Sequence, residues 1–412
     1  MESACLNAPE NGEIEIHATS DKPLQINQPI HLINKSIILR AASGTRPRLL
    51  FQLEDKKVIG SGGLIELQSN SSLSLFKLDI EFQIDPMIKR SNPALFTISG
   101  EESSLRLSDC SLKVSSDRNK NATLIHLKRP EQLSATVSET APGSKIDISR
   151  CFIHGNSRLC QLDTVVPGSV SITESVIATA AETVYLENSK GTERLKTELS
   201  FNRESPETVE LNLTRCTLLC GNSFLYLDRT LDKNENMPRI KVLTTDNIFV
   251  GKNSDQSFVQ TNYSENPLTV SLISTFPERF EWREGSDFID GFDIYYQNNP
   301  DATGSLALPV TRITDWRALW KKTNNRELKS KRGFIQFHNT FEEITFTKLE
   351  LEAFQLEGTS DTNAAINGSS DGQDDAGAPV FELIDLIKPA TTSNGQPPRT
   401  KPSPPSNSPI TS

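Results

Sequence analysis

Long apolar runs are missing from this 412-residue chain, and acidic residues outnumber basic ones. No run approaches the length of a membrane span, and the N-terminus, which carries Glu2, Glu10 and Glu13, lacks the apolar core of a signal peptide. We therefore expect a protein without a membrane segment and, by default, a cytoplasmic one. The sequence leaves open whether an export signal or a further domain precedes Met1.

The charge balance excludes a nucleic acid as the main partner. Lysine and arginine total 43 against 53 aspartate and glutamate residues, a net charge of -10, whereas binding to a phosphate backbone draws on clustered cations. One basic concentration comprises Arg317, Lys321, Lys322, Arg326, Lys329, Lys331 and Arg332. We interpret it as a solvated face, and the alternative is a contact for an acidic glycan or an acidic protein segment.

A short pattern recurs along the chain. In residues 104–114 apolar side chains alternate with polar ones, which is the period-two pattern of a half-buried strand. The pattern returns at residues 73–80, 146–153, 170–177, 211–218 and 240–249. A small residue marks the same place in five copies: Cys110, Cys151, Ser175, Cys216 and Asn247. The shortest step, from Cys151 to Ser175, is 24 residues, so the longer steps indicate the same unit with an inserted loop.

Each unit also has an upstream strand, as in residues 95–98, 124–127 and 224–227. Two or three short strands per unit, without helical periodicity between them, favour a parallel β-helix over a leucine-rich repeat. We expect an all-β solenoid of about seven or eight coils. A short helix near residues 2–9 would cap its first coil, because an uncovered sheet edge invites association with other chains.

Two parts of the chain carry a resemblance to a known family. Residues 2–16 and 36–47 resemble the first coils of bacterial right-handed, single-stranded parallel β-helix repeat proteins of the pectate-lyase-like type. Residues 354–356 and 372–378 are similar to their closing segment, so the resemblance covers residues 1–388. It implies a right-handed coil of the non-catalytic type that is often linked to serine/threonine kinases. Nothing in the chain itself resembles a kinase motif.

The six cysteines are Cys5, Cys110, Cys151, Cys160, Cys216 and Cys220. Three of them occupy the marker position, where Ser175 and Asn247 stand in other units, so an internal stack of small side chains explains them better than disulfides. Cys216 and Cys220 lack the paired spacing of a zinc site. Disulfides and a metal site are the alternatives, and we expect no cofactor.

One acidic cluster is a weak candidate for a metal site. Asp287, Asp290 and Asp293 would offer oxygen ligands to calcium. Aromatic residues interleaved with them favour instead the solvated outer face of a terminal coil whose inner face is aromatic. A second acidic pattern is interrupted where a calcium loop needs glycine, and it comprises Asp371, Asp375 and Glu382.

Beyond residue 300 the composition changes. Thr314 or Asp315 would cap a helix from about residue 316 to 324, with Trp316 and Trp320 on one face. We interpret both tryptophans as a cover over the last coil, and the alternative is a stacking platform for a ligand.

The chain therefore divides into three parts. Residues 1–300 form the β-helix. Residues 301–388 form a C-terminal capping and return segment, with strand character at 343–346, which we expect to run back along the outside of the solenoid. Residues 389–412 have the composition of a disordered Pro- and Ser-rich tail.

Enzymes of this fold place their substrate groove among inserted loops, here residues 128–143, 187–207 and 228–238. The carboxylate and histidine motifs of a β-helix lyase or hydrolase are absent from the repeats. We therefore expect a non-catalytic scaffold that binds a polysaccharide or a protein, in an oligomeric state that the sequence does not specify. The alternatives are a carbohydrate-active lyase or hydrolase, and the detached sensory portion of a kinase-linked signalling protein.

Overall fold

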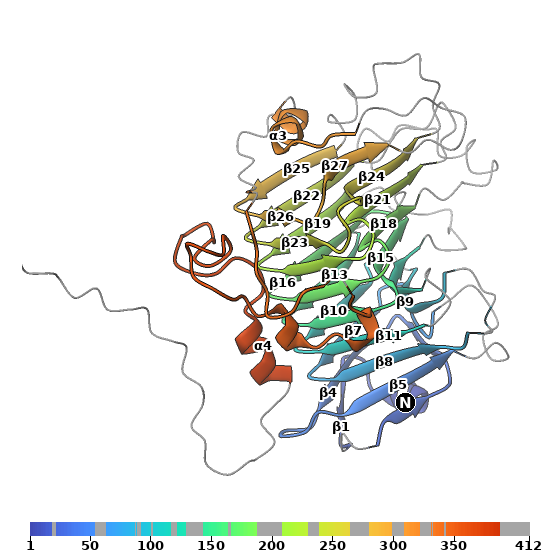
Figure 1. Cartoon of the computed structure of the whole chain (residues 1–412). Coiled ribbons are helices and arrows are strands. Elements are labelled where there is room, and N and C mark those ends of the chain that lie inside the picture. Colours follow the sequence, from blue (N-terminus) through green and yellow to red (C-terminus); the bar gives the residue numbers. More distant parts are fainter. Residues whose placement is uncertain are drawn as a thin grey trace, which may run out of the picture.

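The computed structural model describes residues 1–18, 22–53, 63–86, 88, 92–99, 102–116, 122–128, 143–163, 166–187, 208–229, 239–263, 280–298, 309–321, 331, 333–341 and 343–387. Within these residues the chain winds into a parallel β-helix, in which every coil contributes one strand to each of three sheets (Figure 1). The all-β solenoid expected from the repeats is confirmed. The described residues form nine coils, two of which precede the first copy of the repeat pattern.

We name the sheets A, B and C in the order in which the chain visits them. Sheet A contains β1 (Gly12–Ile16), β4 (Ser36–Ala41), β7 (Ser72–Phe76), β10 (Ser104–Ser108), β13 (Ser144–Ser149), β16 (Gly168–Thr173), β19 (Thr208–Thr214), β22 (Arg239–Thr245) and β25 (Phe280–Gly285). Sheet B contains β2 (Leu24–Ile26), β5 (Arg48–Leu53), β8 (Asp79–Ile84), β11 (Ser111–Ser115), β14 (Phe152–Gly155), β17 (Val176–Thr179), β20 (Thr217–Cys220), β23 (Ile248–Gly251) and β26 (Phe288–Asp290). Sheet C contains β3 (Ile30–Ile33), β6 (Ile65–Gln68), β9 (Ala94–Ile98), β12 (Thr123–Leu127), β15 (Arg158–Asp163), β18 (Val184–Glu187), β21 (Leu225–Arg229), β24 (Ser257–Tyr263) and β27 (Ile294–Asn298).

The period-two alternation of the sequence decides which side chains enter the interior. On β10 Leu105 and Leu107 are buried, whereas Arg106 between them is exposed. The register pairs Leu105 with Leu73 on one neighbouring coil and with Ile146 on the other. Apolar side chains therefore stack in columns along the solenoid axis, and each coil buries its inner face against its neighbours.

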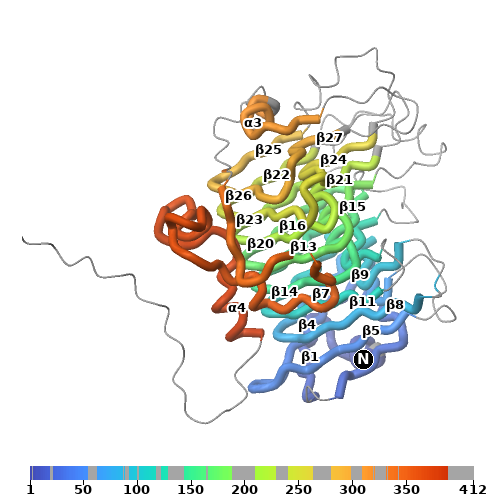
Figure 2. The backbone as a smooth tube through the Cα atoms, viewed as in Figure 1, coloured from blue at the N-terminus to red at the C-terminus, as the bar shows by residue number. Residues whose placement is uncertain are grey.

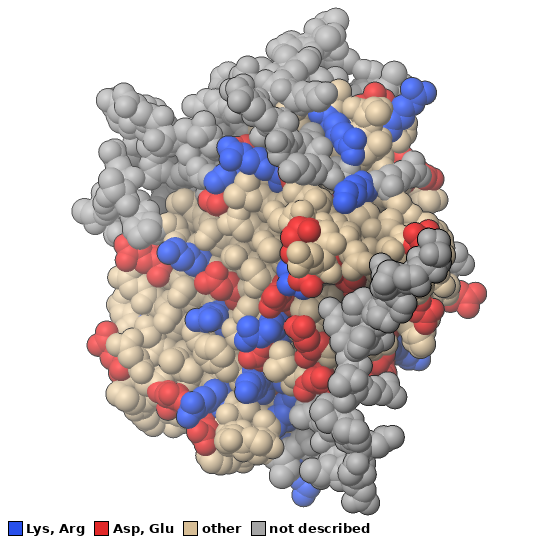
Figure 3. Space-filling model, turned by 90° about the vertical axis from the view of Figure 1, so that its left-hand side faces the viewer, with Lys and Arg blue, Asp and Glu red and all other residues tan. Residues whose placement is uncertain are grey.

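Sheets A and B meet at a corner made of one left-handed residue followed by one buried residue. The left-handed residues have φ between 48° and 57° and are Lys77, Asp109, Arg150, Glu174, Arg215, Asp246 and Ser286. From Lys77 to Asp246 their charges alternate in sign, and the Arg150 Nε donates to the Asp109 Oδ1 on the neighbouring coil at 2.6 Å. Figure 3 shows basic and acidic side chains interleaved on this side of the solenoid.

The buried residue of this corner is the marker position of the repeat. It is fully shielded from solvent in seven successive coils and is occupied by Leu78, Cys110, Cys151, Ser175, Cys216, Asn247 and Asp287. Polar members bind the backbone of the preceding coil. The Ser175 Oγ accepts the Cys151 N–H at 3.0 Å, and the Asn247 Oδ1 accepts the Cys216 N–H at 2.9 Å. The six cysteines of the chain are buried free thiols.

Helices cover both ends of the solenoid (Figure 1). α1 (Glu2–Asn7) lies at the first coil and buries Cys5, which is 1% exposed. α3 (Ile313–Lys321) lies at the last coil and buries Trp316 and Trp320 completely. Their ring centroids lie 5.2 and 5.9 Å from that of Trp282 on β25. The two tryptophans therefore close the aromatic interior of the last coil, as the sequence indicated.

Residues 333–341 and 343–387, which we call the return segment, run back along the outer face of sheet B (Figure 2). They contain two single turns, η2 (Phe346–Lys348) and η3 (Leu351–Phe354), and the helix α4 (Val380–Ile387). The strand character expected at 343–346 gives way to η2, because Phe346 packs onto the outer face of sheet B instead of pairing with an edge. The contact is a second apolar cluster that includes Phe152, Val176, Leu219, Phe346, Phe354 and Leu383.

Several expectations fall on residues outside the described ranges. These are the central parts of the three inserted loops, most of the basic run and the tail from residue 388 onwards. Of the basic run, Arg317 lies on α3 and Lys331 forms an isolated parallel bridge with Phe288. None of the helices in the described ranges is long and apolar enough to cross a membrane.

Candidate functional site on the outer face of sheet C

The three inserted loops all join sheet C to sheet A. They follow the sheet C strands β12, β18 and β21, and each ends where the next sheet A strand begins. β18 and β21 are neighbours in sheet C, and β15 lies between β18 and β12. Loops on a rigid scaffold commonly carry binding residues, so the outer face of sheet C at these strand ends is the candidate binding surface.

Two polar rows run along this face from coil to coil. In the first row Gln161, Tyr185 and Tyr226 are register partners on β15, β18 and β21. In the second row, two residues further along each strand, Asp163, Glu187 and Asp228 are register partners. We call these six residues the sheet C site. Neighbouring parallel strands are about 4.8 Å apart, so the site repeats the same polar groups at that interval along the axis.

The two tyrosines form a stack that is closed at one end by a cation. The rings of Tyr185 and Tyr226 are parallel within 3°, with their centroids 5.3 Å apart. The Arg158 guanidinium lies over the Tyr185 ring, 3.9 Å from its centroid. Glu182 holds this guanidinium in place, because it accepts from the Arg158 Nε at 2.7 Å and also from the Asn222 amide at 2.8 Å.

Short hydrogen bonds connect the two rows. The Tyr185 hydroxyl donates to the Asp228 Oδ2 at 2.5 Å, and the Gln161 amide donates to the Glu187 Oε2 at 2.5 Å. Burial raises the pKa of the Tyr185 hydroxyl, and the hydrogen bond to the Asp228 carboxylate and its charge raise it further. The tyrosine therefore remains a proton donor at all physiological pH values, which fixes the position of the Asp228 carboxylate.

The three carboxylates of the second row differ in exposure. Asp163 is buried, with 3% of its surface exposed, whereas Glu187 and Asp228 are half-buried. Within the described ranges no three His, Cys, Asp or Glu side chains are arranged to hold a metal ion.

The residues singled out for calcium lie in three different environments. Asp287 is the last marker residue and points into the interior, where its Oδ1 accepts from the backbone and side-chain amides of Asn247, both at 2.8 Å. Asp290 is half-buried at the end of β26, and Asp293 is exposed beyond it. The neighbouring Glu284 is also buried, and its Oε1 accepts from the Trp282 and Trp316 indoles. The acidic cluster is therefore split between the interior and the surface.

The second acidic pattern belongs to a turn of the return segment. The Asp371 Oδ1 accepts from the Ser369 hydroxyl at 2.5 Å and from the Gln373 N–H at 3.0 Å. These hydrogen bonds lower the pKa of the Asp371 carboxyl. Asp375 accepts from the Asn367 N–H, while Glu382 lies on α4. The carboxylate of Asp371 thus closes its own turn.

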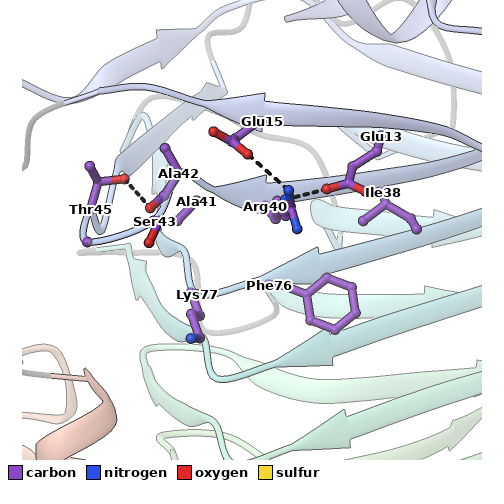
Figure 4. A pocket seen from close by; sticks show the side chains of 11 residues that line it. Glu13, Glu15, Ile38, Arg40, Ala41, Ala42, Ser43, Thr45, Phe76 and Lys77 are labelled. Atoms are coloured by element: carbon purple, nitrogen blue, oxygen red, sulfur yellow. Dashed lines mark hydrogen bonds and ion pairs between the residues drawn. The ribbon is translucent and has the colours of Figure 1, made fainter.

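A hollow of about 540 Å³ lies on the outer face of sheet A at the first coils (Figure 4). Arg40 forms its centre and is held between Glu13 and Glu15, with Phe76 beside it on the next strand. Lys77 stands at the rim. The two carboxylates balance the two cations of the lining, and half of the Arg40 side chain is open to solvent. The hollow is therefore a neutral, shallow surface feature with little to fix a ligand.

The sheet C site was missed at the level of the sequence, although a signal for it exists. A leucine followed by an acid ends three successive upstream strands, in the triplets Gln161-Leu162-Asp163, Tyr185-Leu186-Glu187 and Tyr226-Leu227-Asp228. The alternation turns each leucine inward and the residues on both sides of it outward. His126 on β12 is the register partner of Gln161 and is half-buried in the same row.

Comparisons with known proteins add nothing to this picture. The chain matched no protein-family model, no curated protein and no solved structure. The likeness to pectate-lyase-like and kinase-linked β-helix proteins therefore remains a resemblance of sequence features, while the parallel β-helix itself is a property of the structure.

Proposed function

We propose that this protein is a non-catalytic β-helix that binds a polysaccharide along the outer face of sheet C. The observation that carries the proposal is the half-buried stack of Tyr185 and Tyr226, which is flanked by the half-buried carboxylates of Glu187 and Asp228. Planar amides and carboxylates hydrogen-bond sugar hydroxyls, and aromatic rings offer apolar surface with a polar edge. A solenoid that places aromatic and acidic groups in register on successive coils suits a linear polymer.

The charge of the face indicates which polysaccharides it fits. Among the described residues of this region, the acids Asp163, Glu182, Glu187 and Asp228 outnumber the cations Lys128 and Arg158. A polymer of uronic acids would meet like charges there, which disfavours binding by several kcal/mol when water is excluded. The proposed ligand is therefore a polysaccharide without carboxyl groups.

Binding to immobilised and soluble polysaccharides tests the proposal. We expect retention on one or more neutral polymers and none on polygalacturonate, with or without calcium. Tyr226→Ala should weaken binding about tenfold, because it removes an aromatic contact of roughly 1.4 kcal/mol. Asp147→Ala, an exposed acidic residue on sheet A, is the matched control and should bind like the wild type. Equal affinity of the two variants, or binding of polygalacturonate alone, would contradict the proposal.

A further inference from the structure

The return segment covers an apolar surface that the β-helix would otherwise expose. Phe152, Val176 and Leu219 point outward from sheet B and are buried in the apolar cluster that sheet B forms with the return segment, which contributes Phe346, Phe354 and Leu383. Parallel sheets with an apolar outer face need such a cover. The stability of this contact therefore decides whether the outer face of sheet B is closed or open.

One titratable side chain lies inside the contact. His154 on β14 is 7% exposed and faces outward beneath η2, with its ring stacked on Phe152 at 4.6 Å between centroids. Its Nδ1 lies 2.8 Å from the carbonyl oxygen of Phe346. A carbonyl oxygen only accepts, so Nδ1 carries the proton and donates it to the return segment.

Burial and a neighbouring cation disfavour a second proton on the ring of His154. Lys113 is its register partner on β11, and Glu81, one coil further, is bound by Arg48 and Gln83. Lys252, which follows β23, has its ammonium 5.3 Å from the centre of the Phe346 ring and donates to the Ile344 carbonyl, and Lys348 belongs to η2. Burial is the main cause that lowers the pKa of His154 to about 4, and the charge of Lys113 adds to it, whereas the hydrogen bond to the Phe346 carbonyl and the charge of Glu81 oppose it.

We propose that His154 makes the return segment an acid-sensitive cover, which moves away from sheet B at η2 when the imidazole takes up a proton. In the open form the ring is hydrated and has its ordinary pKa, near 6.5. Between pH 6.5 and about 4 the open form therefore binds more protons than the closed form, and acid favours opening. Above pH 6.5 the cover is closed, and below about pH 4 a further fall in pH no longer shifts the equilibrium towards the open form, because both forms are then protonated. This regulation of the sheet B face is independent of polysaccharide binding at sheet C.

Hydrogen exchange of the η2 and η3 amides, corrected for the intrinsic effect of pH, measures opening directly. From pH 7 to pH 4 we expect the opening equilibrium to rise about 100-fold in the wild type. His154→Asn places an amide donor near the position of Nδ1 and cannot titrate, so its exchange should not change with pH. His338→Asn is the matched control, because His338 is an exposed histidine of the same segment, paired with Glu357. It should behave like the wild type.

A second variant tests the proposal independently, in case His154→Asn disturbs the structure. Lys113→Met keeps the histidine and removes the nearest cation, so the closed form tolerates the proton better and the rise in exchange should be clearly smaller than in the wild type. The proposal is overturned if the opening equilibrium of the wild type does not change between pH 7 and pH 4. It is also overturned if the rise in acid persists in His154→Asn. A rise that disappears in His338→Asn overturns it as well.

Discussion

Asp287 shows how one corner position accepts different side chains. The marker residues are all fully buried and, in Ser175, Asn247 and Asp287, offer an oxygen that accepts an N–H of the preceding coil. Asp287 meets both conditions but places a carboxyl group where no water reaches it. Burial raises its pKa to about 8, and the neighbouring Glu284 contributes to this rise. A buried acid is therefore kept protonated near neutral pH.

Asp287→Asn should make the protein more stable in a manner that depends on pH. The pKa of Asp287 is about 8 in the folded protein and 3.8 in the unfolded chain, so the stability it contributes is complete below pH 3.8 and is lost as the pH rises to 8. The asparagine keeps the acceptor and carries no charge. The gain in unfolding free energy should be near zero at pH 4 and reach on the order of a few kcal/mol at pH 8. Urea unfolding of both proteins across this range measures it, and parallel stability curves would refute it.

The return segment is held at several points by single polar contacts to the corners of the solenoid. Arg46 donates to the Leu386 carbonyl near the end of α4, and the Asp246 carboxylate accepts from the Ser370 N–H and hydroxyl at 2.6 and 2.8 Å. The Thr217 hydroxyl accepts the Ala378 N–H at 3.0 Å. These contacts fix the register of a segment that otherwise packs through non-directional apolar surface.

Thr217→Val tests one of these contacts with little change of shape. Thr217 is 2% exposed, and valine leaves the Ala378 N–H without its acceptor, which should cost about 1 kcal/mol. Thr214→Val serves as the control, because Thr214 is exposed on the outer face of sheet A. It lies two residues before the buried Cys216 of the corner. The difference between the two variants in chemical denaturation is the relevant quantity. If both lose the same stability, the hydrogen bond from Ala378 contributes nothing specific.

The elements differ in how far the sequence determines them. The alternation in residues 104–114 predicts β10 and β11 almost to the residue, because each strand has one buried face. The capping tryptophans are predictable as well, because Trp316 and Trp320 are four residues apart and therefore share one face of a helix. Residues 343–346 have strand composition, but Phe346 packs on the apolar outer face of sheet B, and the segment does not pair with a sheet edge. The sheet C site escapes prediction because the register of Asp163, Glu187 and Asp228 depends on how insertions of unequal length are accommodated.

The whole molecule behaves as a stack of coils that contact their neighbours, so the two ends of the solenoid are independent to a first approximation. The end at β25 depends on α3, where the Trp316 ring packs on Trp282 and its indole nitrogen donates to Glu284 at 2.9 Å. Removal of this cover exposes an aromatic interior and the edges of three strands, which invites association. The first coil is far from α3, so its stability does not change.

Trp316→Ala should therefore destabilise one end of the molecule. The loss of a buried tryptophan costs about 3–5 kcal/mol, and hydrogen exchange should accelerate in β25, β26 and β27 while β10, β11 and β12 keep their protection. Leu6→Ala at the opposite end is the control, because Leu6 is 55% exposed and its loss should leave all coils protected. Uniform loss of protection along the solenoid would show that the coils unfold as a single unit.

The alternating charges at the corner between sheets A and B also limit how such a chain can change its length in evolution. Loss of the single coil that carries Arg150 would place Asp109 beside Glu174, and like charges on neighbouring strands destabilise a sheet. Loss of two successive coils instead leaves opposite charges adjacent. Duplications and deletions are therefore expected to be retained in pairs, so that related solenoids would differ by an even number of coils.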